Sequence, residues 1–342
     1  MAITRLTQLG FESNGSGSLM ELSSYSGSEI QLSSTVKKTG NYSLRFASTN
    51  THYARCSLPA TFQARFGMHL RLGGMYTGSD ATFFYALNDV GTTLFSLDCT
   101  SSAVRLNVGG TLRASTPSSF PWPDFIHVGI DAKIASSGGW VNVYFDGTLV
   151  MSFSGNTGTT AMVQIGFGSR TALALVTSWV DDIIIDDTTG ESAAAPVPDY
   201  RFIALPANNN GYYSQWTGSD GNNIDNYELV DEQPHDGDST YVYADALNER
   251  DTYALTDISL PSGFIVSAVI PYAYARKTSA GVATKLAFAL RQNNTDWTSA
   301  DLNLPTSYQY LSARAPTAPD GSNWTESKVN SCEAGAVGRG DF

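Results

Sequence analysis

Short runs in which apolar and polar side chains alternate recur along the first 190 residues, and glycine, asparagine or serine closes most of them. In the run 42–48, Tyr42, Leu44 and Phe46 fall on one face of an extended chain. This period of two is the pattern of a half-buried strand. Alternation, together with Gly-Gly and Asp-Gly turns, predicts further strands at 31–34, 81–87, 93–98, 103–108, 111–114, 140–145, 148–153 and 179–186. No helix of several turns is predicted in this half, which favours an antiparallel sandwich or jelly roll over a parallel sheet.

The composition also fits strands joined by turns. The 342 residues include 31 Gly, 16 Phe, 17 Tyr and 6 Trp, and charged residues make up 15% of the chain. The net charge is −12, with only 20 Lys and Arg residues. A disordered polyelectrolyte would carry more charge, and a protein that binds a phosphate backbone needs more cations. Nucleic acid is therefore not an expected partner.

Cysteine usage and hydropathy narrow the cellular context. Cys56, Cys99 and Cys332 have no zinc-ligand spacing and are too few for a disulfide framework, so we expect buried thiols. No apolar run approaches the ~20 residues of a membrane-spanning helix, so no membrane insertion is expected. The first ten residues lack the pattern of a secretory signal. We therefore expect a protein of a reducing cytosol, or one that leaves the cell by a route such as lysis.

A change in composition predicts where the chain divides. Residues 188–199 are mostly small and include two prolines, and such a segment has little capacity to pack. We predict a jelly-roll domain at 1–189, a linker at 190–199 and a second, smaller β-domain at 200–342. In the second domain the sequence predicts strands at 200–205, 227–231, 240–244, 251–255, 264–275 and 284–291, a helix at 325–334 and a frayed, glycine-rich tail at 336–342. The predicted fold class is thus all-β: an antiparallel jelly-roll sandwich followed by a second, smaller β-domain.

Four motifs of the first half carry a resemblance to a known group of proteins. They are GFE at 10–12, GNYSLRF at 40–46, VNVYFDGTLV at 141–150 and WVDDIII at 179–185. Together they resemble the concanavalin A-like or laminin-G-like jelly roll, a group that includes many carbohydrate-binding modules. The resemblance implies a β-sandwich of the jelly-roll type.

The acidic pair Asp181 and Asp182 lies inside a predicted strand. Strict alternation places Asp181 on a face with Ile183 and Ile185, and Asp182 on the other face with Ile184. Both faces are apolar, so we expect at least one buried carboxylate. A buried carboxylate without a cation or several hydrogen-bond donors costs several kcal/mol.

The resemblance supplies one partner for these carboxylates. In the carbohydrate-binding modules, an early Phe-Glu and a closing Asp-Asp provide oxygen ligands to a structural calcium ion. Carried over by residue, this implies a calcium site at Glu12, Asp181 and Asp182. The alternative is a strand end that leaves the carboxylates in solvent or capping a turn.

A second acidic cluster comprises Asp236, Gly237 and Asp238, with Asp231 and Glu232 just before it. Alternating oxygen side chains around a glycine turn are found in loops that bind hard cations, but the other ligands of an EF-hand loop are missing. A solvated turn is the preferred interpretation.

Catalytic motifs are missing from the sequence. There is no Glu-x-Asp-x-Glu run, no Gly-x-Ser-x-Gly elbow, no His-Glu-x-x-His and no phosphate-binding loop. His52, His69, His127 and His235 are isolated from one another in the sequence, so each is expected to be a packed or surface residue. The protein is therefore expected not to be an enzyme.

Sugar binding has two candidate residues. Glycan sites pack the apolar face of a sugar ring on Trp or Tyr. Trp122, between two prolines, and Tyr76, in a glycine-containing loop, are the candidates for such a site, with core or rim packing as the alternative for each. The Arg-Gly-Asp triplet at 339–341 is given no function, since such triplets arise by chance in glycine-rich tails.

The second half carries its own resemblance, to a module of structural proteins of tailed bacteriophages. The motifs are WTG at 216–218, NYELVDE at 226–232, DSTYV at 238–242, DTY at 251–253 and WTE at 324–326. They imply a non-enzymatic virion protein assembled in the host cytoplasm, either a tail-associated fibre or adhesin or a capsid decoration. The expected partners are other virion proteins, further copies of the chain in a homo-oligomer, and host-surface glycans. The alternatives are a free bacterial carbohydrate-binding lectin module and, less favoured, a glycanase with an unrecognised site.

Overall fold

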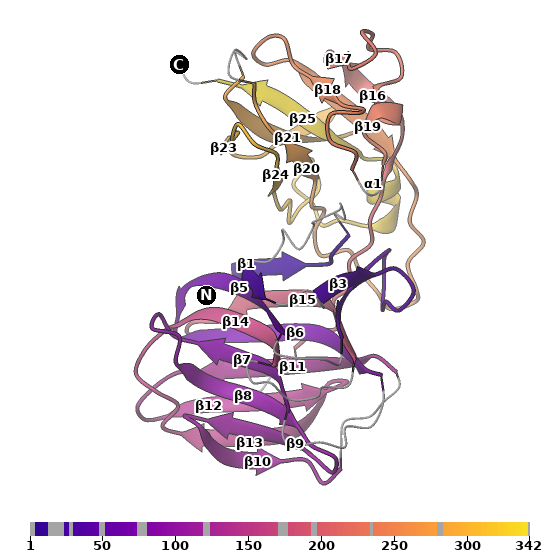
Figure 1. The fold of residues 1–342 in the computed structure, drawn as a ribbon. Helices are drawn as coiled ribbons and strands as arrows, with labels where there is room; N and C mark the ends of the chain where they lie inside the picture. The colour runs from indigo at the N-terminus through magenta and orange to yellow at the C-terminus, as the bar shows by residue number, and fades with distance from the viewer. Residues whose placement is uncertain are drawn as a thin grey trace. The chain divides into compact units, whose positions relative to one another are not determined.

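The computed structural model describes residues 4–12, 24–26, 30–47, 52–73, 81–118, 124–169, 177–192, 197–232, 235–278 and 283–340. These residues form two compact units, which we call unit 1 (described residues up to Ala204) and unit 2 (from Leu205 onward) (Figure 1). The regular secondary structure of both is almost all antiparallel strand, which confirms the predicted all-β fold class. No helix in the described ranges is long and apolar enough to cross a membrane.

Unit 1 is a sandwich of two antiparallel sheets with a jelly-roll order of strands (Figure 1). Sheet A has the order β13 (Thr148–Gly155), β12 (Gly139–Phe145), β11 (Ile126–Lys133), β6 (Gln63–Leu72), β15 (Ser178–Asp187), β4 (Ser43–Phe46) and β3 (Ile30–Ser33), and β1 (Thr4–Leu9) also pairs with β15. Sheet B has the order β10 (Thr111–Ser115), β9 (Val104–Val108), β8 (Thr93–Cys99), β7 (Ala81–Leu87), β14 (Met162–Ser169), β5 (His52–Thr61) and β2 (Ser24–Ser26).

One continuous apolar core lies between the two sheets. Phe66 of sheet A contacts Phe84 and Phe95 of sheet B, with ring centroids 5.6 and 6.2 Å apart, and Phe84 also meets Phe167 edge-on at 5.7 Å. All four rings are at most 1% exposed. Tilted and edge-to-face ring pairs of this kind add about 0.5–1.5 kcal/mol each beyond the burial of their area.

Many predicted strands of unit 1 are confirmed, including both hairpins with glycine turns. Gly109 and Gly110 join β9 to β10, and Asp146 and Gly147 join β12 to β13, all four with positive φ as a type I′ turn requires. The sequence did not predict β5, β6, β11 and β14. β6 and β11 do alternate apolar residues with polar residues or glycine, and only the apolar positions pack in the core of unit 1. Their polar positions are also largely buried, because the outer face of sheet A is covered there.

Unit 2 contains a smaller sheet and two short ribbons. Sheet C has the order β16 (Ala207–Ser214), β19 (Arg250–Leu255), β25 (Glu333–Arg339), β21 (Lys285–Gln292) and β22 (Thr295–Thr298), and β23 (Leu302–Asn303) also pairs with β21. The ribbons are β17 (Thr217–Gly218) with β18 (Val242–Tyr243), and β20 (Tyr272–Ala275) with β24 (Gln309–Ser312). The helices are the 3-10 helix η2 (Asn226–Leu229) and α1 (Glu326–Asn330).

Several predictions for the second half are wrong. Residues 200–205 form no strand, 227–231 begin in η2, and only the last part of 264–275 forms a strand. The predicted helix 325–334 ends at Asn330, and the segment read as a frayed tail contains most of β25, which pairs with β19 and β21. A Cβ at Gly335 would collide with the Asp251 carbonyl oxygen. Within the predicted tail, a Cβ at Gly338 would lie 3.0 Å from the Ala244 side chain, so glycine in β25 permits close packing rather than fraying.

The predicted linker 190–199 is partly packed. Val197 is 3% exposed and lies over Gly67 of β6 and Gly129 of β11, where a Cβ would approach its side chain to 3.1 and 2.9 Å. Residues 197–202, which we call the strap, thus cover the outer face of sheet A. The division between the two units falls after Ala204.

Candidate functional site

A β-bulge in β15 shapes the acidic pair. The pairing of β15 with β6 places Asp181 opposite His69 but Ile184 opposite Gly67, so β15 has one residue more than β6 over this stretch. Asp182 takes up the extra residue with a φ of 50°. Bulges of this kind re-aim side chains and disrupt the two-residue period of a strand.

The bulge changes which side chains share a face. Val180, Ile183 and Ile185 all pack in the core of unit 1, whereas Asp181 lies on the outer face of sheet A with its partner residue of β6. The prediction that Asp181 shares a face with Ile183 and Ile185 is therefore wrong. The expected burial is confirmed, because Asp181 is 0% and Asp182 2% exposed.

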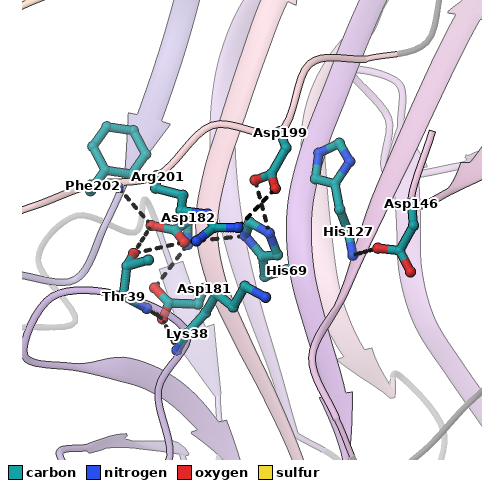
Figure 2. Close-up of polar contacts among 10 residues, drawn as sticks. All are labelled: Lys38, Thr39, His69, His127, Asp146, Asp181, Asp182, Asp199, Arg201 and Phe202. Atoms are coloured by element: carbon teal, nitrogen blue, oxygen red, sulfur yellow. Dashed lines mark hydrogen bonds and ion pairs between the residues drawn. The ribbon is translucent and has the colours of Figure 1, made fainter. Parts of the chain in front are cut away.

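His69 lies between two carboxylates (Figure 2). Its Nδ1 is 3.1 Å from Asp182 Oδ2, and its Nε2 is 3.1 Å from Asp199 Oδ1 on the strap. A neutral imidazole has only one N–H, so both contacts are attractive only in the imidazolium form. Burial lowers the pKa of His69, but the contacts and charges of Asp182 and Asp199 outweigh it, and the pKa is raised above its ordinary value. Arg201 Nη2, 3.1 Å from Asp199 Oδ2, adds a second cation.

Backbone donors hold the neighbouring carboxylate. Asp181 Oδ2 accepts hydrogen bonds from the backbone N–H groups of Lys38 (2.8 Å) and Thr39 (3.4 Å), and its Oδ1 accepts one from the N–H of Asp182 (2.8 Å). Burial, and then the charge of Asp182, raise the pKa of Asp181 above its usual range. Asp182 Oδ1 in turn accepts from the Thr39 hydroxyl (2.7 Å) and from the backbone N–H of Phe202 (2.8 Å) on the strap.

The three predicted calcium ligands meet the same short segment, residues 38–42. Asp181 and Asp182 bind its first part, and Glu12 accepts from the backbone N–H groups of Asn41 (2.6 Å) and Tyr42 (3.3 Å). Calcium takes six to eight oxygen ligands. In the described ranges no group of three or more His, Cys, Asp or Glu residues is placed to hold a metal ion. Here N–H and O–H donors meet the carboxylates, and calcium stays a prediction from the resemblance.

His127 extends the cluster to a small pocket. It pairs in register with His69, with ring centroids 5.3 Å apart, and its backbone N–H donates to Asp146 Oδ1 (2.9 Å; Figure 2). Burial and the charge of His69 lower the pKa of His127 to about 4, so it is neutral at pH 7. His127 and Asp146, together with Val197 and Asp199, line a pocket of about 230 Å³. The described contacts of the cluster fix the strap and residues 38–42 to sheet A.

Sequence reasoning missed the histidines and Asp199 as members of one cluster. His69 and His127 meet because β6 and β11 pair, and Asp199 belongs to a segment read as a linker. No local spacing signals either contact. The two predicted sugar-binding residues, Tyr76 and Trp122, lie outside the described residues.

The cluster at Asp236 and Asp238 is an exposed turn, as the sequence predicts. Gly237 has a φ of 72°, and the Asp238 side chain is 63% exposed. Asp238 Oδ1 accepts hydrogen bonds from Arg276 Nη2 (2.9 Å) and from the Tyr308 hydroxyl (2.7 Å). These contacts give the carboxylate partners without a metal ion.

Unit 2 differs from unit 1 in the number of tyrosine rings that it exposes. In the described part of unit 2, Tyr212 is 67% exposed, and Tyr241, Tyr243 and Tyr272 are 40–41% exposed. In the described part of unit 1, Tyr25 is the single tyrosine with comparable exposure. Exposed aromatic rings are typical of surfaces that bind sugars or other proteins.

Comparisons with known proteins do not place the chain in a family. No family model and no curated protein matches it. Similar solved structures include a cellulose-induced protein (16% identity; 48% of this chain and 90% of that one; TM-score 0.40) and domain 4 of an extracellular arabinanase from Geobacillus stearothermophilus in complex with arabinotriose (13%; 58% and 96%; 0.41). A third is a protein of unknown function with a galectin-like fold from Bacillus subtilis (12%; 54% and 98%; 0.38). TM-scores below 0.5 assign neither family nor function, and none of these descriptions mentions a phage.

Proposed function

We propose that this protein is a non-enzymatic adhesion protein that binds glycans through unit 2, with unit 1 as a scaffold. The observation that carries the proposal is the exposure of Tyr212, Tyr241, Tyr243 and Tyr272 on one unit. A tyrosine ring at the surface has an apolar face for a sugar ring and a hydroxyl for polar contacts. The net charge of −12 suits neutral glycans better than nucleic acid or anionic membranes.

Binding and turnover are tested together on the full chain. The protein is applied to an array of neutral and acidic glycans, and separately incubated with the polysaccharides that give signal while new reducing ends are measured. We expect sugar-specific binding without turnover. A blank array removes the adhesion assignment, and sustained release of reducing ends replaces it with a glycanase.

The setting that we propose is the virion of a tailed bacteriophage, where the chain serves as a tail-associated fibre or adhesin or as a capsid decoration, in a homo-oligomer. This rests on the phage-like motifs of residues 216–218, 226–232 and 324–326. Repeated particle positions are symmetric, so a protein that occupies them is expected to be oligomeric. Co-purification with intact particles, with capsid, portal and tail genes nearby, supports this setting. A chain that is released free of particles is instead the lectin module named above.

A further inference from the structure

Tyr212 and Tyr213 occupy a β-bulge region of the edge strand β16, where the chain backbone is fixed by side chains of sheet C. Glu333 Oε2 accepts hydrogen bonds from the backbone N–H of Tyr212 and from the Thr252 hydroxyl, both at 2.8 Å. The Thr252 hydroxyl oxygen also accepts from the N–H of Tyr213 (3.1 Å). A Cβ at Gly211 would lie 2.5 Å from both of these side-chain oxygens, so glycine is required there. The backbone of the two tyrosines is therefore held in one position.

The two rings form a right-angled corner. Their centroids are 5.0 Å apart and their planes meet at 88°. The Arg291 guanidinium carbon lies 4.0 Å from the Tyr212 ring centre and 5.3 Å from that of Tyr213. Arg291 thus covers one face of Tyr212, and with 67% of its side chain exposed, Tyr212 presents the other face to solvent.

Asp296 locks this corner in place. Its carboxylate accepts from the Tyr213 hydroxyl (2.8 Å), from Arg250 Nη1 (2.7 Å) and from Arg291 Nη1 (2.5 Å). Arg291 Nη2 also donates to Asn294 (2.9 Å). A guanidinium has five N–H groups. In the described part of the chain, the Arg250 side chain donates one hydrogen bond and is 28% exposed, so it has further N–H groups for acceptors of a ligand. Arg291, whose side chain is 11% exposed, serves to hold the rings.

The charges of the corner are balanced. Arg250 and Arg291 are matched by Asp296 and Glu333, and the whole chain carries −12. An anionic ligand would gain little net attraction here and would meet the negative field of the protein. A neutral ligand with an apolar face and several hydroxyl oxygens meets the exposed ring and the remaining N–H donors at once.

We propose that the corner formed by Tyr212, Tyr213, Arg250, Arg291 and Asp296 binds a neutral pyranose sugar, which packs its C–H face on Tyr212 and accepts hydrogen bonds from Arg250. This assignment rests on the proposed glycan-binding function and names its site and ligand class. A single sugar ring on one aromatic platform is a weak ligand, with a Kd on the order of 1 mM. Avidity in an oligomer raises the apparent affinity without new contacts.

The test uses four neutral probes, the methyl pyranosides of glucose, galactose, mannose and N-acetylglucosamine, titrated into the full chain and followed by NMR. N-acetylneuraminic acid serves as the acidic probe. We expect at least one neutral sugar to bind, Tyr212→Ala to weaken it at least about tenfold, and Tyr212→Phe to keep it, because the ring rather than the hydroxyl makes the contact. The matched control is Tyr25→Ala, which removes an exposed tyrosine of unit 1, outside the proposed binding unit. Because Tyr212 is largely exposed, Tyr212→Ala is expected to melt with the wild type.

The outcomes separate the site from the function. Loss in Tyr212→Ala but not in Tyr25→Ala supports the site. Unchanged binding in Tyr212→Ala, loss in Tyr212→Phe, or binding of the acidic probe alone overturns the site and leaves glycan binding by the protein standing. A wild-type chain that binds none of the five probes and gives a blank array overturns the site and the proposed function together.

Discussion

Unit 1 buries four phenylalanine rings between its sheets, whereas unit 2 leaves four tyrosine rings 40–67% exposed. Both units are antiparallel and all-β, so the difference is in how much of their aromatic surface is buried. Buried rings supply the largest hydrophobic and packing gains of a small domain. Exposed rings give up that gain, and the proposed function gives them a role in binding.

The hydrophobic cores of the two units also differ, and again unit 1 is the better packed one. Unit 1 has one continuous core that spans both sheets. The described part of unit 2 has separate small clusters around Trp324, Phe288 and Val337. A divided core buries less apolar area per residue, so unit 2 is expected to unfold first. The difference suggests a division of labour between a rigid scaffold and a less stable, interactive module.

The largest expected effect comes from opening the core of unit 1. Phe84 is fully buried and contacts three other phenylalanine rings, so Phe84→Ala is expected to destabilise unit 1 by about 3–5 kcal/mol. Urea unfolding followed by hydrogen exchange reports each unit separately. The control is Phe62→Ala, a change at a 51% exposed ring, for which we expect a change within about 0.5 kcal/mol. Equal effects of the two substitutions would contradict the sandwich core.

The second effect is confined to unit 2. Gly335 lies in the central strand β25, where a Cβ would collide with the Asp251 carbonyl oxygen of β19. Gly335→Ala is therefore expected to force these strands apart and to cost about 3 kcal/mol. Calorimetry should show the unit 2 transition lowered and that of unit 1 unchanged. A variant that melts like the wild type would mean that β19 and β25 do not pair closely.

Local alternation predicts part of the fold and fails for identifiable reasons. It finds β9, whose burial alternates along its length, and the hairpins whose turns contain glycine. β6 and β11 alternate in the same way and are missing from the predicted strands although the pattern is there; what the pattern does not foretell is that their polar positions are buried as well. Local alternation assigns Gly338 of β25 to a frayed end, although a Cβ there would lie 3.0 Å from the Ala244 side chain. A single sequence does not distinguish a flexible glycine from a closely packed one.

The candidate sites are less accessible to sequence reasoning than the fold. Burial of Asp181 follows from its apolar neighbours, but the bulge at Asp182 reverses the faces of the following isoleucines. The corner around Tyr212 joins strands that lie about 80 residues apart in the chain, since Asp296 and Arg291 come from β22 and β21. Only strand pairing brings such residues together.

Calcium removal tests whether unit 1 owes part of its stability to an ion. The resemblance predicts that excess chelator lowers the melting temperature of unit 1 and that Asp181→Ala abolishes this sensitivity. An ion at 100 times its Kd would contribute about 2.7 kcal/mol. Unit 2 serves as the internal control, because none of the predicted ligands lies in it. An unchanged melt of unit 1 in chelator would contradict a stabilising ion at these carboxylates.

The smallest effect is a pH dependence that separates the units. The pKa of His69 is raised in the folded state, so its stabilisation is fully present below pH 6.5 and is lost as the pH rises through the folded pKa. The raised pKa of Asp181 acts in the same direction. In unit 2, burial lowers the pKa of His235. The titration of His235 therefore changes the stability of unit 2 only at pH values below 6.5. Above pH 6.5 we therefore expect unit 1 to lose stability relative to unit 2.

The magnitude follows from the charge of one side chain. Each pH unit by which the folded pKa of His69 exceeds 6.5 corresponds to about 1.4 kcal/mol. Urea unfolding at pH 6.5, 7.5 and 8.5 measures the loss, and hydrogen exchange at the Phe202 amide shows whether the strap opens with it. His69→Gln is the matched control, because a neutral side chain removes the histidine titration and retains hydrogen-bonding groups. If the wild type and this variant show the same slope above pH 6.5, the imidazolium between Asp182 and Asp199 is not what fastens the strap to sheet A.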